Sequence, residues 1–102
     1  MLIVLTATPD SKEAERLADL AVSKKLAACV QILPTMTSVY FWEGKIQKEQ
    51  EHLLLIKTLP ENYEELEAFI NENHSYEVPE IVAIESSNVS SKYREWLENY
   101  LR

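Results

Sequence analysis

Cysteine and glycine are nearly absent from this 102-residue chain, which contains one of each. The single cysteine, Cys29, excludes a disulfide within the chain and any CxxC metal or redox motif. The single glycine, Gly44, excludes the P-loop and the GxGxxG dinucleotide fingerprint, because both need several glycines. We therefore predict no organic cofactor.

Long hydrophobic runs are absent as well, since no apolar stretch approaches the roughly 20 residues that cross a bilayer. The apolar N-terminus, residues 1–8, has neither a basic region nor a small-residue cleavage site, and is typical of a strand rather than a signal peptide. We expect a cytoplasmic protein without a membrane partner.

Basic residues are scarce relative to acidic ones, with 10 Lys and Arg against 17 Asp and Glu and a net charge of −7. The whole excess lies in residues 51–102. This balance argues against a nucleic-acid partner. A solvated acidic surface explains the excess most simply, and the alternative is a surface that attracts cations.

The hydrophobic pattern of the first third predicts strand, helix, strand. Residues 2–5 form a continuous apolar run, typical of a strand buried on both faces. Asp10 is a good helix N-cap, apolar residues recur at helical spacing from Ala14 to Val22, and Lys24 follows at the helix end. Residues 28–33 are again apolar and favour a second strand.

The rest of the chain predicts a hairpin followed by helix, strand and helix. The hairpin has arms at residues 36–43 and 46–58 around Gly44, and a second helix starts at Pro60. Residues 80–85 favour a strand, and Asn88 or Ser90 caps a final helix. The order indicates one domain over residues 1–102, of the α+β class, with a ferredoxin-like split βαβ sandwich, a long central hairpin and an extra C-terminal helix.

The predicted hairpin carries consecutive aromatic residues, Tyr40, Phe41 and Trp42, which project from both faces of a protruding ribbon. A helix of the same chain can cover only one of those faces. We therefore expect a second copy of the chain to cover the other, with Trp96 of the last helix docking in the same way.

Few residues are candidates for chemistry. Cys29 is predicted to pack as a small hydrophobe in its strand, and its alternative role is a soft ligand for copper or zinc. His74 ends the second helix, where a protonated imidazole suits the helix terminus, and its alternative role is a metal ligand. No nucleophile–base pair is recognisable, so we do not expect an enzyme.

Three charged residues lie in predicted strands and need partners. Lys57 is predicted to pair with Glu80 or with Glu51 in a structural ion pair. The functional alternative is a polar pocket in which Lys57 holds an anion or a carboxylate ligand.

Segments over nearly the whole chain resemble the CutA family of divalent-cation tolerance proteins. The matching residues, in family order and at family spacing, are Thr8-Pro9-Asp10, residues 25–30, 38–40 and 42–46, Glu51, Lys57-Thr58, His74, Tyr76, Val78-Pro79-Glu80, Tyr93 and Trp96.

The resemblance implies a tight homotrimer in which strands pair between subunits, with an architecture similar to that of PII signalling proteins. It also implies a cleft near the subunit boundary, formed by Cys29, Trp42, Glu51, Lys57, His74, Tyr76 and Glu80. The family is linked to tolerance of divalent metals, copper especially. Some bacterial members have a cysteine and paired histidines where this chain has Thr6 and Asn73-His74, which argues against a copper site of that kind.

These observations favour a trimeric, non-catalytic protein that binds a divalent metal ion, copper or zinc, or a small ligand in the cleft, with His74 as the candidate metal ligand. One alternative is a PII-like module that senses a small anionic metabolite through Lys57. The other is a trimeric scaffold that anchors partner proteins.

Overall fold

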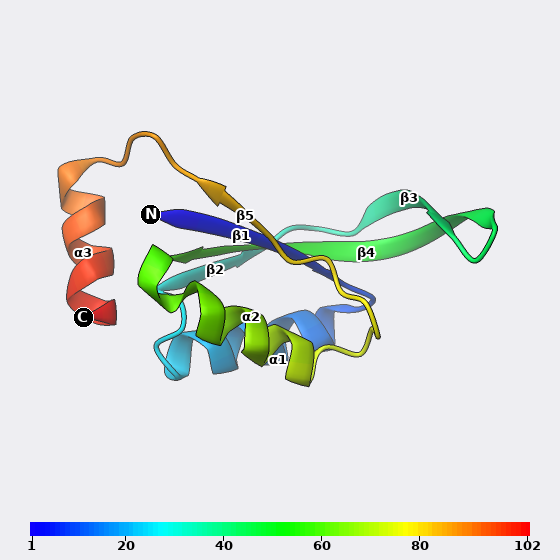
Figure 1. Cartoon of the computed structure of the whole chain (residues 1–102), viewed down its shortest axis with the longest axis horizontal. Helices are drawn as coiled ribbons and strands as arrows, with labels where there is room; N and C mark the ends of the chain where they lie inside the picture. Colours follow the sequence, from blue (N-terminus) through cyan, green and yellow to red (C-terminus); the bar gives the residue numbers. More distant parts are fainter.

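The computed structural model describes residues 1–102 as a five-stranded sheet with three α-helices (Figure 1). The elements in chain order are β1 (Leu2–Thr8), α1 (Ser11–Ser23), β2 (Cys29–Ile32), β3 (Met36–Trp42), β4 (Lys45–Thr58), a short 3-10 turn η1 (Pro60–Asn62), α2 (Tyr63–Asn73), β5 (Val82–Glu85) and α3 (Ser91–Leu101).

The sheet has the order β2-β4-β1-β5, and β3 pairs with the first half of β4. All pairings are antiparallel. Strand β4 lies between β1 and β2, and β1 lies between β4 and β5, so each β-α-β unit is split by a strand of the other. The predicted α+β class and split arrangement are confirmed.

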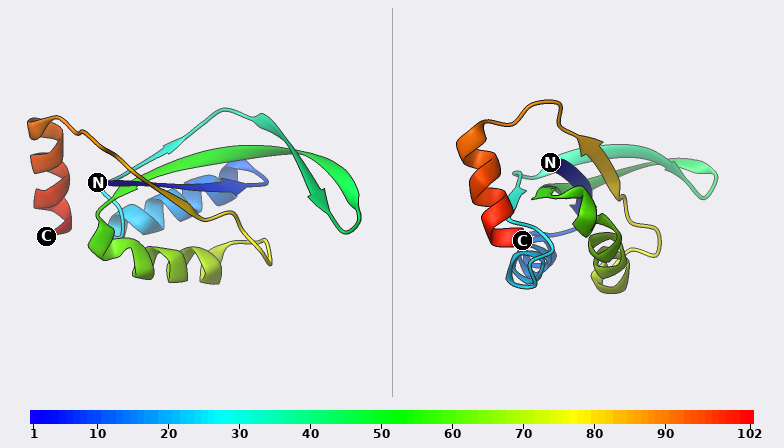
Figure 2. Two further views of the ribbon diagram at one scale, coloured as in Figure 1. Left: turned by 45° about the horizontal axis from the view of Figure 1, so that its top comes forward. Right: turned by 60° about the vertical axis from the view of Figure 1, so that its left-hand side comes forward.

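Helices α1 and α2 lie on the same side of the sheet in both views of Figure 2. Val4 and Ile56 are cross-strand partners on this face, and they share one buried cluster with Leu17 of α1 and with Leu66 and Ile70 of α2. Burying a side chain of this size stabilises the fold by roughly 1.5–3 kcal/mol. This core fixes the sheet on which the candidate site is built.

Local signals explain most element boundaries. Asp10 caps α1, because its side chain accepts the backbone N–H of Glu13 at 2.8 Å. Two predicted boundaries were wrong by two or more residues. Pro60 opens the separate turn η1 rather than α2, and β5 begins at Val82 rather than Glu80 because its pairing with β1 starts only there.

The hairpin β3–β4 projects beyond the helices, as Figure 1 shows. Strand β4 has 14 residues, and the molecule measures 45 Å along its longest axis. The two-residue turn has positive φ at Glu43 (51°) and Gly44 (80°), as a type I′ turn requires. Phe41 and Ile46 near the tip remain 71% and 70% exposed.

Helix α3 packs across the end of the sheet opposite the hairpin tip (Figure 1). Its Leu97 is fully buried with Ala28 and Leu59, and the Tyr100 hydroxyl donates to the Val22 carbonyl at 2.5 Å. Trp96 of the same helix, by contrast, remains 50% exposed. None of the helices is long and apolar enough to cross a membrane.

No helix of the chain covers the second face of the sheet. Ile3, Leu5 and Leu55 project there, because they alternate with the core residues of β1 and β4. Val82 and Ile84 of β5 lie opposite Leu5 and Ile3, and each remains about half exposed. Within one chain this face is an apolar surface without a cover.

Candidate functional site

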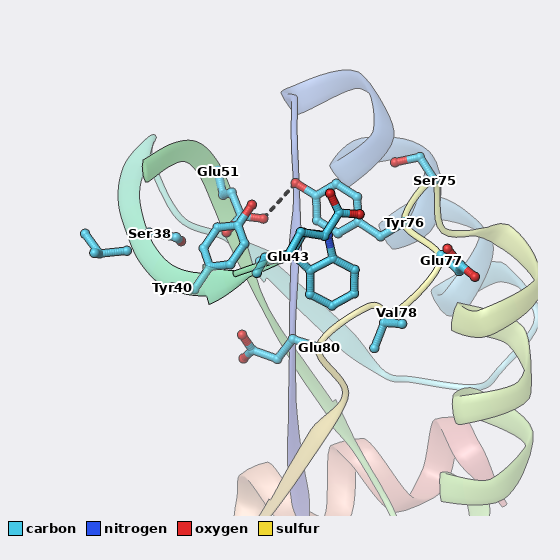
Figure 3. Close-up of a pocket in the computed structure, with 12 residues that line it drawn as sticks. Ser38, Tyr40, Glu43, Glu51, Ser75, Tyr76, Glu77, Val78 and Glu80 are labelled. Atoms are coloured by element: carbon cyan, nitrogen blue, oxygen red, sulfur yellow. Dashed lines mark hydrogen bonds between the residues drawn. The ribbon is translucent and has the colours of Figure 1, made fainter. Parts of the chain in front are cut away.

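A hollow of about 670 Å³ lies between the hairpin and the segment that joins α2 to β5 (Figure 3). Volumes of this order are typical of small-molecule sites. The hairpin contributes one side and residues 75–80 contribute the other. Its lining consists of Ala7, Ser38, Val39, Tyr40, Trp42, Glu43, Glu51, Ser75, Tyr76, Glu77, Val78 and Glu80.

Strand alternation brings the hairpin side chains to one face. Ser38, Tyr40 and Trp42 are two residues apart and project to the same side of β3. Met36 shares that side and lies directly opposite Glu51 of β4, so the Glu51 carboxylate joins the same face. The hairpin therefore offers aromatic rings, a hydroxyl and a carboxylate to the hollow.

Glu51 and Tyr76 join the two sides of the hollow. The Tyr76 hydroxyl donates to Glu51 Oε2 at 2.8 Å, as Figure 3 shows, and Glu51 is only 7% exposed. Burial raises the pKa of Tyr76 well above its usual value, and the hydrogen bond to Glu51 and the negative charge of that residue raise it further. Tyr76 therefore stays protonated and remains a donor, while Glu51 Oε1 has no hydrogen-bond partner.

His74 is buried and holds in place the loop that carries Tyr76. Its Nε2 is 2.7 Å from the Ala7 carbonyl oxygen, which can only accept, so Nε2 carries a proton. Its Nδ1 accepts the backbone N–H of Tyr76 at 3.0 Å and lies 3.4 Å from Glu13 Oε2. Both ring nitrogens are used inside the fold, and a metal ion would have to displace one of these contacts.

His74 is the C-cap residue of α2, as predicted, but its ring does not interact with the end of the helix. Its backbone N–H bonds Ile70, but its ring bonds Ala7 and Tyr76 rather than the last carbonyls of the helix. The ring therefore acts as a bridge between β1 and the loop that lines the hollow.

Lys57 and Cys29 lie far from the hollow, as cross-strand partners near the α3 end of the sheet. The Lys57 ammonium lies 5.4 Å from the centre of the Tyr93 ring, a cation–π contact. The predicted ion pair of Lys57 with Glu80 or Glu51 was wrong. Glu51 is six residues away along β4, about 20 Å at 3.3 Å per residue, and its partner is Tyr76.

Of the residues expected in the cleft, the structure brings together Trp42, Glu51, Tyr76 and Glu80. His74 is buried and does not line the hollow, and Cys29 is half-buried at the other end of the sheet. Thr6 is fully buried, its hydroxyl lacks a partner, and it does not line the hollow. No group of three or more His, Cys, Asp or Glu side chains in one chain is arranged to hold a metal ion.

The hollow is strongly acidic. Its lining includes four glutamates, Glu43, Glu51, Glu77 and Glu80, and no lysine, arginine or histidine. The nearby charges of Glu49 and Glu51 also contribute to raising the pKa of Tyr40, after burial as the main cause. A region of negative potential bounded by protein attracts cations and repels anions.

The predicted cleft omitted eight of the twelve lining residues: Ala7, Ser38, Val39, Tyr40, Glu43, Ser75, Glu77 and Val78. The alternation of β3 places Ser38 with Tyr40 and Trp42, and that signal could have found it. No comparable signal exists for residues 75–77, because the path of an irregular loop depends on contacts such as that of His74 with Ala7.

Comparison with known proteins shows to which family this chain belongs. The sequence profile of the CutA1 divalent ion tolerance protein family matches residues 2–100. "Protein CutA, chloroplastic" of Arabidopsis thaliana is 45% identical over 99% of this chain, which spans 56% of that relative's length. The "Divalent-cation tolerance protein CutA" of Yersinia pestis is 38% identical over 94% of this chain and 81% of its own length.

Solved structures agree with the fold. CutA1 from Oryza sativa superimposes with a TM-score of 0.96 at 42% identity, covering 99% of this chain and 93% of that one. CutA1 from Pyrococcus horikoshii has a TM-score of 0.95 at 33% identity, covering 100% of this chain and 99% of that one. One relative is described as chloroplastic and another, from Archaeoglobus fulgidus, as periplasmic, so a cytoplasmic location stays a prediction for this chain.

Proposed function

The chain belongs to the CutA1 divalent ion tolerance protein family, and we propose that it is a trimeric, non-catalytic protein that binds divalent cations in the acidic hollow. The observation that carries this proposal is the lining of four glutamates without a basic side chain. The names of its relatives as divalent-cation tolerance proteins agree with it.

The available ligands favour hard cations. The hollow offers carboxylate oxygens and the hydroxyls of Ser38 and Ser75, whereas Cys29 and His74 do not line it. Oxygen ligands suit Mn²⁺, Mg²⁺ and Ca²⁺, while thiolate and imidazole suit copper. We therefore expect modest affinity, weak selectivity and no tight copper site.

Trimer formation is supported by the surface that one chain leaves uncovered. The exposed hairpin residues Phe41 and Ile46 and the half-exposed Val82 and Ile84 of the open sheet face are large hydrophobic side chains. Large exposed hydrophobic side chains in such numbers are typical of an interface. Because the carboxylates of one chain do not form a metal-ligand set, we expect a neighbouring subunit to complete the coordination.

Native mass spectrometry tests both parts of the proposal. The metal-free protein is expected at three times the subunit mass, and added Mn²⁺ is expected to give whole-number adducts per subunit. A double variant, Glu43→Gln with Glu80→Gln, removes two charges from the hollow, and the double variant Glu64→Gln with Glu65→Gln, at exposed positions of α2, is the charge control. Metal binding that persists in Glu43→Gln with Glu80→Gln, or that falls equally in the control, would contradict the site, and a monomer would contradict the assembly.

The alternative of a PII-like sensor for an anionic metabolite requires Lys57 at the site. Lys57 lies at the opposite end of β4 and contacts Tyr93, and the hollow itself repels anions. The scaffold alternative is favoured only by the exposed apolar hairpin, which a trimer would also explain.

A further inference from the structure

Metal binding does not explain the aromatic residues that line the hollow. Tyr40, Trp42 and Tyr76 line it together with the glutamates. Tyr40 and Trp42 remain 40% and 45% exposed in the single chain. Aromatic faces contribute nothing to the coordination of a small hydrated metal ion, but they attract organic ammonium groups and pack against methylene chains.

The carboxylates of the hollow are also distributed over its lining rather than clustered at one point. They come from three separate segments: Glu43 from the hairpin turn, Glu51 from β4, and Glu77 and Glu80 from the loop before β5. They do not converge on one point as metal ligands do. A ligand with several positive charges separated by apolar linkers satisfies such an arrangement better than a single ion does.

Glu51 offers a specific anchor within the hollow. It is nine-tenths buried, its Oε2 is held by Tyr76, and its Oε1 has no partner in the structure. Figure 3 shows Glu51 beside Tyr40, with Tyr76 reaching toward it from the other side. An ammonium group bound here would donate to the free oxygen while lying close to aromatic rings.

We propose that the hollow binds a linear organic polyammonium ion, whose methylene chain lies against Tyr40 and Trp42 while its separated ammonium groups bind Glu51 and the loop glutamates. The volume of about 670 Å³ is sufficient for such a ligand. This proposal rests on the proposed function, because it takes the hollow to be the cation site. It adds organic ammonium ions to metal ions as a class of ligand.

Isothermal titration calorimetry with spermidine, at fixed ionic strength, tests the proposal. We expect saturable binding at one spermidine per subunit. Replacing Trp42 by leucine should weaken binding by roughly three- to tenfold, because it removes one cation–π contact. The double variant Glu43→Gln with Glu80→Gln should weaken it by about tenfold or more. The control, Glu64→Gln with Glu65→Gln, should have little effect, since it removes the same number of charges outside the hollow.

If the Trp42 variant does not fold, the charge variants still test the proposal. Glu43 and Glu80 are exposed, so their replacement by glutamine should not disturb the packing of the fold. Spermidine binding that is insensitive to Glu43→Gln with Glu80→Gln, or equally sensitive to Glu64→Gln with Glu65→Gln, would overturn the proposal in favour of diffuse attraction to the acidic surface. Titration with Mn²⁺ separates the two proposals. Site-specific Mn²⁺ binding without spermidine binding would overturn only the polyammonium ligand, and binding of neither would overturn both.

Discussion

Replacing Thr6 by valine is expected to stabilise the protein. Thr6 lies on the core face of β1 opposite Leu54, is fully buried, and its hydroxyl has no hydrogen-bond partner. A buried hydroxyl without a partner costs about 1–3 kcal/mol relative to its solvated state. Valine has nearly the same shape, so the packing is retained and the free energy of unfolding should rise by roughly 1 kcal/mol.

Thr58 is the matched control, because it is equally buried but satisfied. Its hydroxyl donates to the Leu26 carbonyl at 2.6 Å, so Thr58→Val should lower the free energy of unfolding by about 1 kcal/mol. Urea denaturation at one fixed protein concentration measures both variants, as a shift of the midpoint at unchanged slope. If Thr6→Val destabilises the protein as much as Thr58→Val does, the unpaired state of the Thr6 hydroxyl is refuted.

Three further predictions concern the site and the assembly. The raised pKa of Tyr76 favours its neutral form in the folded state. The resulting contribution to the free energy of unfolding is fully present below the unfolded-state pKa of about 10 and is lost as the pH rises above it. In urea melts at different pH, Tyr76→Phe should lose this part of the fall in stability at alkaline pH. His74→Asn should lower the free energy of unfolding by about 1–3 kcal/mol, because the two hydrogen bonds of its ring are lost. The number of Mn²⁺ ions bound in native mass spectra should stay unchanged, and a loss of bound Mn²⁺ would show that His74 is a ligand. The thermal midpoint should rise with protein concentration, and Phe41→Ser should reduce that dependence if the hairpin lies in the trimer interface.

The fold was largely predictable because its signals are local. Asp10 marks the start of α1 through a side-chain bond to a residue three positions away. Gly44 marks the hairpin because it adopts positive φ beside Glu43. The order of helices and strands then leaves few arrangements for one small domain, and the split βαβ sheet is one of them.

The site was less predictable because its contacts join distant segments. The alternation of β3 and β4 places Tyr40, Trp42 and Glu51 on one face, and this could be read from the sequence. Tyr76 reaches Glu51 from a loop whose His74 ring bonds Ala7, a contact between residues 67 positions apart. Lys57 was expected to pair with a carboxylate, but the docking of α3 places the Tyr93 ring beside it instead.

In the proposed function, cations bind in the hollow rather than over the acidic surface as a whole. Nuclear magnetic resonance with substoichiometric Mn²⁺ tests it directly, because a bound paramagnetic ion broadens the signals of nearby amides. We predict selective broadening of Glu43, Glu51 and residues 76–80, with the exposed acidic residues of α2 little affected. Broadening centred on α2, or spread evenly over residues 51–102, would contradict binding in the hollow.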